Sequence, residues 1–166
     1  MFKNCKSLKK APELPSITLA WNCYSYMFEG CSSLTEAPKL LAKTTRMWCF
    51  EGMFKDCTSL VKAPALPISR IASQCCYKNM FAGCSSLTEA PILPTRILKN
   101  GSYDGMFEGC TSLASITCLA SELEYYASRK WAKDVSKTGT FIKRKGVNWE
   151  TGVSGIPEGW TVIEVE

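Results

Sequence analysis

Histidine is absent from this chain of 166 residues, and so are the short motifs by which many enzymes are recognised. A hydrolase needs a nucleophile with a base beside it, and that base is most often His. No phosphate-binding loop of the G-x-x-x-x-G-K-[ST] type occurs either, and no Asp/Glu pair stands in a recognisable catalytic motif. The sequence therefore predicts a protein that is not an enzyme and that carries no cofactor.

Long apolar runs and a strong charge imbalance are also lacking. No segment approaches the roughly 20 apolar residues of a membrane span, and no charged and then apolar leader opens the chain. The net charge is +5, with 20 Lys and Arg against 15 Asp and Glu, and it forms no dense basic stripe. We expect no nucleic-acid partner and no membrane span.

The ten cysteines include no C-x-x-C pair, so no metal site is expected. Eight of them keep the register of an internal repeat: Cys5, Cys31, Cys57, Cys84, Cys110, and Cys23, Cys49, Cys76. Cysteine at a fixed repeat position is best interpreted as a small buried apolar residue. Disulfides between neighbouring repeats are the alternative, although stacked β-carbons lie about 4.8 Å apart and a disulfide prefers about 3.8 Å. A single activated cysteine in an enzyme is a third possibility.

The repeat itself is the main feature of the chain. The dipeptide Met-Phe recurs five times at an almost constant interval, and only the third interval is longer, by one residue: Met1-Phe2, Met27-Phe28, Met53-Phe54, Met80-Phe81 and Met106-Phe107. A fixed period of this size is the signature of a solenoid, in which each unit buries its apolar face by stacking on the next. Equivalent residues should therefore form continuous columns inside a coil of chain.

Around each Met-Phe the pattern predicts a short helical turn. An aromatic residue precedes the Met by three positions, so that Tyr24 and Phe28 form an i, i+4 pair. Two residues after each Phe stands Asn4, Gly30, Asp56, Gly83 or Gly109. These residue types tolerate a positive φ, which predicts a left-handed residue that closes the turn.

The remainder of each unit predicts a short parallel strand. An invariant Ser-Leu is followed three residues after the Leu by Ala11, Ala37, Ala63, Ala90 or Ile116, and six residues after it by Leu14, Leu40, Leu66, Leu93 or Leu119. Proline follows each Ala, and it has no N–H to give to a sheet. We expect strands of three or four residues and then an extended, polyproline-like stretch.

The phrase Met-Phe-x-Gly-Cys-Ser-Ser-Leu-Thr-x-Ala-Pro-x-Leu-Pro, complete at residues 80–94, resembles the repeat of BspA-like bacterial leucine-rich-repeat proteins. The resemblance covers about residues 1–119 and weakens in the fifth unit, where Ile116 and Thr117 replace Ala and Pro. It implies a curved solenoid, an extracellular or cell-surface setting, and a role in adhesion or ligand binding.

The fold class that we predict is an α/β repeat. It is a leucine-rich-repeat-like solenoid with short parallel strands on one face and short helical turns on the other, plus a small α+β C-terminal cap. The solenoid domain is placed at residues 1–120, with about five units of roughly 26–27 residues each. Because the chain opens inside a repeat, we expect it to be an N-terminally truncated fragment, with upstream repeats of the same protein as partners and any signal peptide missing.

The cap is placed at residues 121–166. Ser121 and Glu124 form a capping box that predicts a helix, and strands are expected after it. Trp131, Phe141 and Trp160 are the residues predicted to cover the last repeat. The physical reason for a cap is that an open solenoid end exposes unpaired strand groups and half a core.

A candidate binding face follows from the outward positions of the strands. One column reads Lys10, Glu36, Lys62, Glu89 and then Ser115, and a second reads Glu13, Lys39, Ala65, Ile92 and then Cys118. The alternating signs of the first column are explained either by ion pairs between repeats, which would fix the register, or by a face that binds a protein or glycan. We therefore expect a non-enzymatic recognition or adhesion module, with candidate residues Lys10, Glu13, Glu36, Lys39, Lys62, Glu89 and Ile92. A structural spacer or stalk is the alternative.

Overall fold

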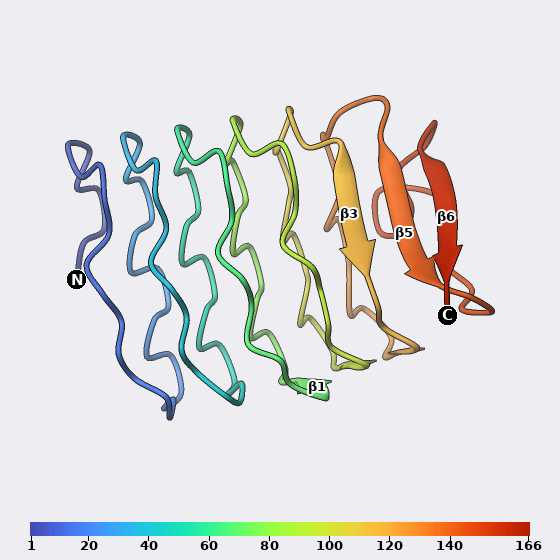
Figure 1. Ribbon diagram of the computed structural model, residues 1–166, viewed down its shortest axis with the longest axis horizontal. Coiled ribbons are helices and arrows are strands. Elements are labelled where there is room, and N and C mark those ends of the chain that lie inside the picture. Colours follow the sequence, from blue (N-terminus) through green and yellow to red (C-terminus); the bar gives the residue numbers. More distant parts are fainter.

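The computed structural model describes residues 1–166 and shows a β-solenoid with its two termini at opposite ends (Figure 1). Six short strands are present: β1 (Ile71–Ala72), β2 (Ile97–Leu98), β3 (Ser115–Cys118), β4 (Glu122–Leu123), β5 (Thr140–Arg144) and β6 (Thr161–Val165). They form two parallel sheets, ordered β1-β2-β4 and β3-β5-β6. Each sheet takes its strands from successive coils, so the stacking predicted from the repeat is confirmed.

The face that carries β3 is joined along its length by single parallel bridges. Lys10 pairs with Glu36, Glu36 with Lys62, Lys62 with Glu89, and Glu89 with Ser115. We name the outward side of this column the strand face. Among the five repeat units a regular strand appears there only in the fifth, at β3, because Pro12, Pro38, Pro64 and Pro91 of the first four units lack the N–H that a continuous ladder needs. The interruption of strand pairing that we expected at the prolines is present. In the first four units, however, isolated bridges stand where strands of three or four residues were predicted.

The loss of proline also shifts the register of the fifth unit. Leu93 pairs with Cys118 and not with Leu119, which the repeat alignment had placed opposite it. Cys118 is consequently buried in the core, so its predicted outward position is wrong. The segment from Ile116 to Cys118 runs straight as part of β3, whereas Ala90-Pro91-Ile92-Leu93 needs one residue more to cover the same distance.

The structure contains no helix, so the short helical turns predicted around each Met-Phe are wrong. Their place is taken by a chain of turns. The N–H of Tyr24 donates to the carbonyl of Cys49 on the next coil (3.0 Å), while the N–H of Ser25 donates back to Asn22 (3.1 Å). A left-handed residue recurs every fourth position, at Asn22, Tyr26 and Gly30. This alternation leaves every second N–H free to bind the neighbouring coil, which an α-helix does not allow.

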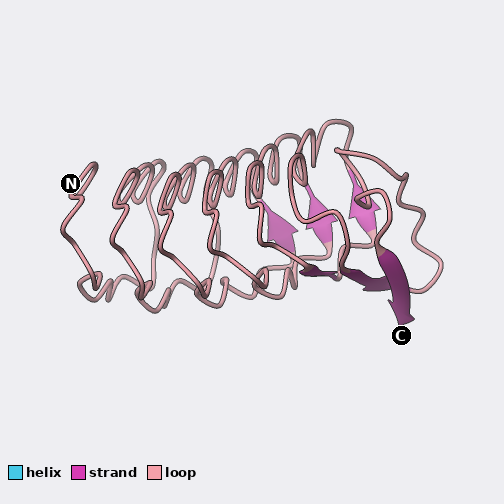
Figure 2. Ribbon diagram, turned by 90° about the horizontal axis from the view of Figure 1, so that it is seen from above, coloured by secondary structure: helices cyan, strands magenta, loops and turns pink.

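We call each such chain of turns a turn ladder. The structure has five, at residues 22–31, 48–57, 75–84, 101–110 and 126–134. They run along one edge of the solenoid (Figure 2).

The predicted helix after Ser121 is wrong as well, and with it the α+β character of the cap. Glu122 and Leu123 form β4, which pairs with β2. The residues after them form the last turn ladder: Tyr103 N–H donates to Ala127 O (2.8 Å) and Phe107 N–H to Trp131 O (2.8 Å). The expected strands are present as β5 and β6, and β5 pairs with β3 across residue 120. The division of the chain at residue 120 stays a prediction.

The core consists of stacked columns, as the repeat predicted. Phe28, Phe54 and Phe81 lie in one file, with ring centroids 5.7 Å apart at each step and interplanar angles of 6° and 8°. A second file contains Tyr24, Phe50, Tyr77 and Tyr103 and ends on Trp131. All these rings are buried.

The far end of the core is covered by aromatic side chains from the C-terminal segment. Trp131 stacks on Trp149 (5.1 Å, 16°), and the ring of Phe141 meets both edge-on. Trp131, Phe141 and Trp160 are buried as predicted, and Trp149 is a fourth member that the sequence reasoning missed. No helix in the structure is long and apolar enough to cross a membrane.

Candidate binding face

The seven candidate residues all have exposed side chains on the strand face. The bridges between coils place Lys10, Glu36, Lys62 and Glu89 in one column, in the predicted order. Glu13 and Lys39 come from the second outward position on the first two coils, and Ile92 from the fourth. The predicted arrangement of alternating charges is therefore present.

These charges are mostly not paired with one another. Lys10 Nζ lies 3.5 Å from a carboxyl oxygen of Glu36, but Lys62, Glu89, Glu13 and Lys39 form no ion pair. The interpretation in which ion pairs between coils fix the register therefore holds only between the first two coils, where Lys10 pairs with Glu36.

Ion pairs between coils are instead concentrated on the turn ladders. Glu29 lies between Lys3 (2.6 Å) and Lys55 (3.9 Å), and Glu51 pairs with Lys78 (3.7 Å). Further along the solenoid, Asp104 pairs with Arg129 (2.9 Å) and Glu108 with Lys133 (3.1 Å). The hydrogen bond to Asp104 raises the pKa of Arg129, and the one to Glu108 raises the pKa of Lys133. Charge on this edge is thus largely neutralised within the protein, whereas charge on the strand face is not.

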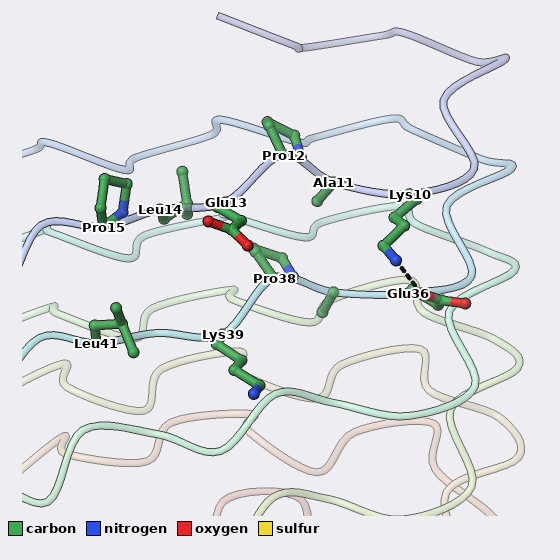
Figure 3. Close-up of a pocket in the computed structure, with 11 residues that line it drawn as sticks. Lys10, Ala11, Pro12, Glu13, Leu14, Pro15, Glu36, Pro38, Lys39 and Leu41 are labelled. Carbon is green, nitrogen blue, oxygen red and sulfur yellow. Dashed lines mark ion pairs between the residues drawn. The ribbon is translucent and has the colours of Figure 1, made fainter.

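A groove of about 400 Å³ lies on the strand face between the first two coils (Figure 3). It is lined by Lys10, Ala11, Pro12, Glu13, Leu14, Pro15, Glu36, Ala37, Pro38, Lys39 and Leu41. Four of the seven candidate residues therefore meet in one concave site, while Lys62, Glu89 and Ile92 lie outside it.

Sequence reasoning missed the walls of this groove, which are Pro12, Pro15, Pro38 and Leu41. The signal that would have identified them is the regular spacing of the prolines. A proline on an interrupted strand leaves main-chain groups uncovered and stands beside them as a rigid apolar ring.

Burial disfavours the reactive thiolate form of the buried cysteines. All ten are free, and burial raises the pKa of Cys49 and of Cys57 to about 12. The Cys57 thiol donates to the carbonyl of Phe28 on the preceding coil (3.1 Å), and Cys31, Cys84 and Cys110 make the same contact with the Phe of the coil before their own. A thiol that stays protonated near neutral pH is a poor nucleophile. No group of His, Cys, Asp or Glu side chains lies close enough together to hold a metal ion.

Comparisons with models of protein families, with curated proteins and with solved structures find no match to this chain. The resemblance to BspA-like leucine-rich repeats stays a prediction drawn from the repeat motif.

Proposed function

We propose that this protein is a non-enzymatic recognition or adhesion module of a bacterial cell-surface or secreted protein, and that it binds a protein or a glycan through the strand face. The observation that carries the proposal is the contrast in charge pairing between two sides of the solenoid. Charged side chains on the turn ladders pair across coils, while Glu13, Lys39, Lys62 and Glu89 are exposed without an ionic partner. Exposed charges held at a fixed spacing provide specificity and steer a partner to its site.

The stacked core supports this role because it holds the face in one shape. Each coil rests on the next through aromatic rings 5.5–5.8 Å apart along the Phe column. A surface that is already ordered loses little entropy when it binds a partner. Solenoids commonly use such an extended surface for binding.

The leucine-rich-repeat class, the extracellular setting and the upstream repeats of the same protein belong to this proposal. They are supported by the Met-Phe-x-Gly-Cys-Ser-Ser-Leu repeat. The raised pKa values of Cys49 and Cys57 support the non-enzymatic part, because they argue against a cysteine nucleophile.

The test is a screen of the purified chain on arrays of extracellular proteins and of glycans. We expect binding to at least one class, and loss of it when the strand-face charges are reversed together (Lys62→Glu with Glu89→Lys, and Glu13→Lys with Lys39→Glu). The matched control reverses a pair on the turn ladders, Glu108→Lys with Lys133→Glu, and should bind normally. Blank arrays would favour the alternative, a structural spacer, for which the continuous aromatic columns would supply rigidity.

A further inference from the structure

Two residues at the start of each turn ladder form a row that runs along the solenoid from coil to coil. Main-chain hydrogen bonds fix its register, from Asn22 N–H to Met47 O (3.3 Å) at one end to Gly101 N–H to Tyr126 O (3.1 Å) at the other. The equivalent pairs are residues 21–22, 47–48, 74–75, 100–101 and 125–126. We name these ten residues the neutral row. Along each coil the turn ladder, which lies on the edge seen in Figure 2, separates the neutral row from the strand face.

None of the ten residues is charged, although 21% of the chain is. The largest side chains that the row exposes are aromatic: Trp21 is 68% exposed, Tyr125 78% and Tyr126 52%. Between them, on the third and fourth coils, the row exposes the amides of Gln74 and Asn100. Exposed aromatic rings that line up on one edge mark an interaction surface, because the core already buries most rings of this chain.

Two of the aromatic residues stand where the fold favours other residue types. Trp48 has a φ of 55° and Tyr126 a φ of 63°, and both conformations are left-handed. The equivalent residues on other coils include Asn22 and Gly101, which adopt this conformation easily. A bulky ring at such a position costs stability, and backbone strain of this kind clusters at ligand sites. The fold alone therefore does not explain the aromatic side chains of the row.

The rings at the far end of the row are held in place by their neighbours. Tyr125 and Tyr126 lie with ring centroids 3.9 Å apart. The guanidinium of Arg129 lies 5.9 Å from the centroid of Tyr126 and is itself paired with Asp104 at 2.9 Å. At the near end, Trp48 is half-buried. Rings that are already ordered lose little entropy when they bind a partner.

The chemistry of the row fits a glycan better than a protein segment. An exposed ring offers a flat apolar surface to the C–H face of a sugar, and an amide can both donate to and accept from its hydroxyls. The row spans four coil steps, which at ~4.8 Å each is about 19 Å. A sugar unit of an extended glycan is comparable in length to one coil step, so a chain of identical units stays in register with the coils.

We propose that the neutral row binds an unbranched, uncharged glycan that runs along the solenoid. Its sugar rings stack on Trp21 and Trp48 at one end and on Tyr125 and Tyr126 at the other, and its hydroxyls bond the amides between them. The inference goes beyond the proposed function, because it adds a second surface with a ligand class of its own.

The experiment titrates the full chain with β-1,4-linked oligosaccharides of glucose and of N-acetylglucosamine, from two to six units long. We expect one series to bind, with an affinity that rises with length up to about four units, the span of the row. Trp21→Ala should weaken binding about 10-fold, and Trp21→Phe, which keeps a flat ring, should weaken it much less. An affinity that is the same for Trp21→Ala and the unchanged protein would overturn the proposal.

Tyr126→Asn separates a role in binding from a role in the fold. Asn accepts the left-handed conformation, so this variant should keep the melting temperature of the unchanged protein while it loses affinity about 10-fold. A lower melting temperature with unchanged affinity would show that the ring serves the fold and would overturn its place in the site. The matched control is Ile68→Ala, which removes an 85% exposed side chain away from the row and should leave glycan binding unchanged.

Tryptophan fluorescence supplies a readout of position. Trp21 is exposed, whereas Trp131, Trp149 and Trp160 are buried, so a sugar that covers Trp21 should shift the emission to shorter wavelength. The shift should shrink in Trp21→Phe although the glycan still binds. A shift of unchanged size in Trp21→Phe would place the ligand elsewhere and overturn the proposal.

Reversing the strand-face charges distinguishes this inference from the proposed function. Glycan binding that persists in Lys62→Glu with Glu89→Lys and is lost in Trp21→Ala supports the neutral row. Glycan binding with the opposite dependence would overturn the row and leave the strand face as the recognition surface. A protein ligand that is lost in Trp21→Ala, with no glycan bound, would also overturn the proposal, because the row would then be a protein-binding surface. If neither oligosaccharide series binds, the neutral row falls, whatever the strand face binds.

Discussion

The side chain of Asp56 occupies the space in which a β-carbon on Gly83 would lie, one coil further along the solenoid. Asn4 covers Gly30 and Asn79 covers Gly105 in the same way. In each pair both residues have a positive φ. The glycine is therefore needed for two reasons: it adopts the left-handed conformation without strain, and it leaves room for the neighbour's side chain.

Replacing Gly83 with Asn should destabilise the protein, although Asn tolerates a positive φ. The new side chain must displace Asp56, and overpacking of this kind costs about 1 kcal/mol. The matched control is Gly109→Asn, at the same position of the next turn ladder, where the nearest atoms are main-chain atoms of Gly83 at 3.6 and 3.7 Å. Urea denaturation should show a clear loss for Gly83→Asn and a much smaller one for Gly109→Asn.

The same pair allows a rescue experiment. Adding Asp56→Gly to Gly83→Asn removes the side chain that is displaced, so the double variant should recover the loss. The double-mutant cycle should give a coupling of about 1 kcal/mol between the two positions. Additive effects would mean that Asp56 does not restrict the residue at 83.

Phe54 is the central ring of the Phe column, with Phe28 on one side and Phe81 on the other, each 5.7 Å away. Truncating it to Ala should lower the free energy of unfolding by about 3–5 kcal/mol, because a fully buried ring leaves a cavity that two rigid neighbours cannot fill. Phe2→Ala should cost clearly less, since Phe2 is only half-buried and stacks on Phe28 alone. Equal costs at the two sites would argue against a continuous column.

Stability should fall in alkali because of the buried thiols. Burial raises the pKa of Cys57 from 9.0 to about 12, and Cys49 behaves alike. In this case the unfolded chain loses its thiol protons first, so stability is fully present below pH 9 and is lost as the pH rises from 9 towards 12. Between pH 8 and pH 9.5 each such thiol should cost about 0.8 kcal/mol in denaturation measurements. In Cys57→Ala the drop between these two pH values should shrink by about that amount.

Thiol labelling should report the burial of the cysteines directly. Cys5 is exposed, Cys23 and Cys75 are half-buried, and the other seven are buried. In the native protein a thiol reagent should therefore modify Cys5 rapidly, Cys23 and Cys75 slowly, and the rest only on unfolding. Denaturation without a reductant should then reveal all ten thiols. A lower total would show that some cysteines form disulfides.

The columns of the core were predictable from the sequence because stacking follows from a count of residues along the chain. Phe28 and Phe54 are one repeat apart, and no local conformation needs to be known to place one on the other. The outward charges of Lys10 and Glu36 were predictable for the same reason. The groove beside them was not, because it depends on how the side chains of two coils pack around Pro12 and Pro38.

The turn ladders were missed because their signal resembles that of a helix. A left-handed residue every fourth position brings residues four apart, such as Tyr24 and Phe28, to one side, and an α-helix does the same. What distinguishes a turn ladder from a helix is that a positive φ is needed at several positions of the segment and not only at its end. Asn22, Tyr26 and Gly30 are four residues apart in one ladder, but the sequence reading assigned a left-handed conformation to the last of them only.

The last turn ladder offers a test for which a helix and a turn ladder predict opposite orders of stability for the same two variants. Lys130 is exposed and has a φ of 53°, within the segment that the capping box predicted to be helical. In a helix, Lys130→Ala would be more stable than Lys130→Gly by about 1 kcal/mol. At a left-handed position the order inverts, because Gly adopts this conformation freely and the β-carbon of Ala costs roughly 1 kcal/mol. Thermal unfolding of the two variants should therefore show Lys130→Gly as the more stable. Because the Lys130 N–H that donates to the Ser154 hydroxyl (3.0 Å) is kept in both, the comparison isolates the backbone conformation.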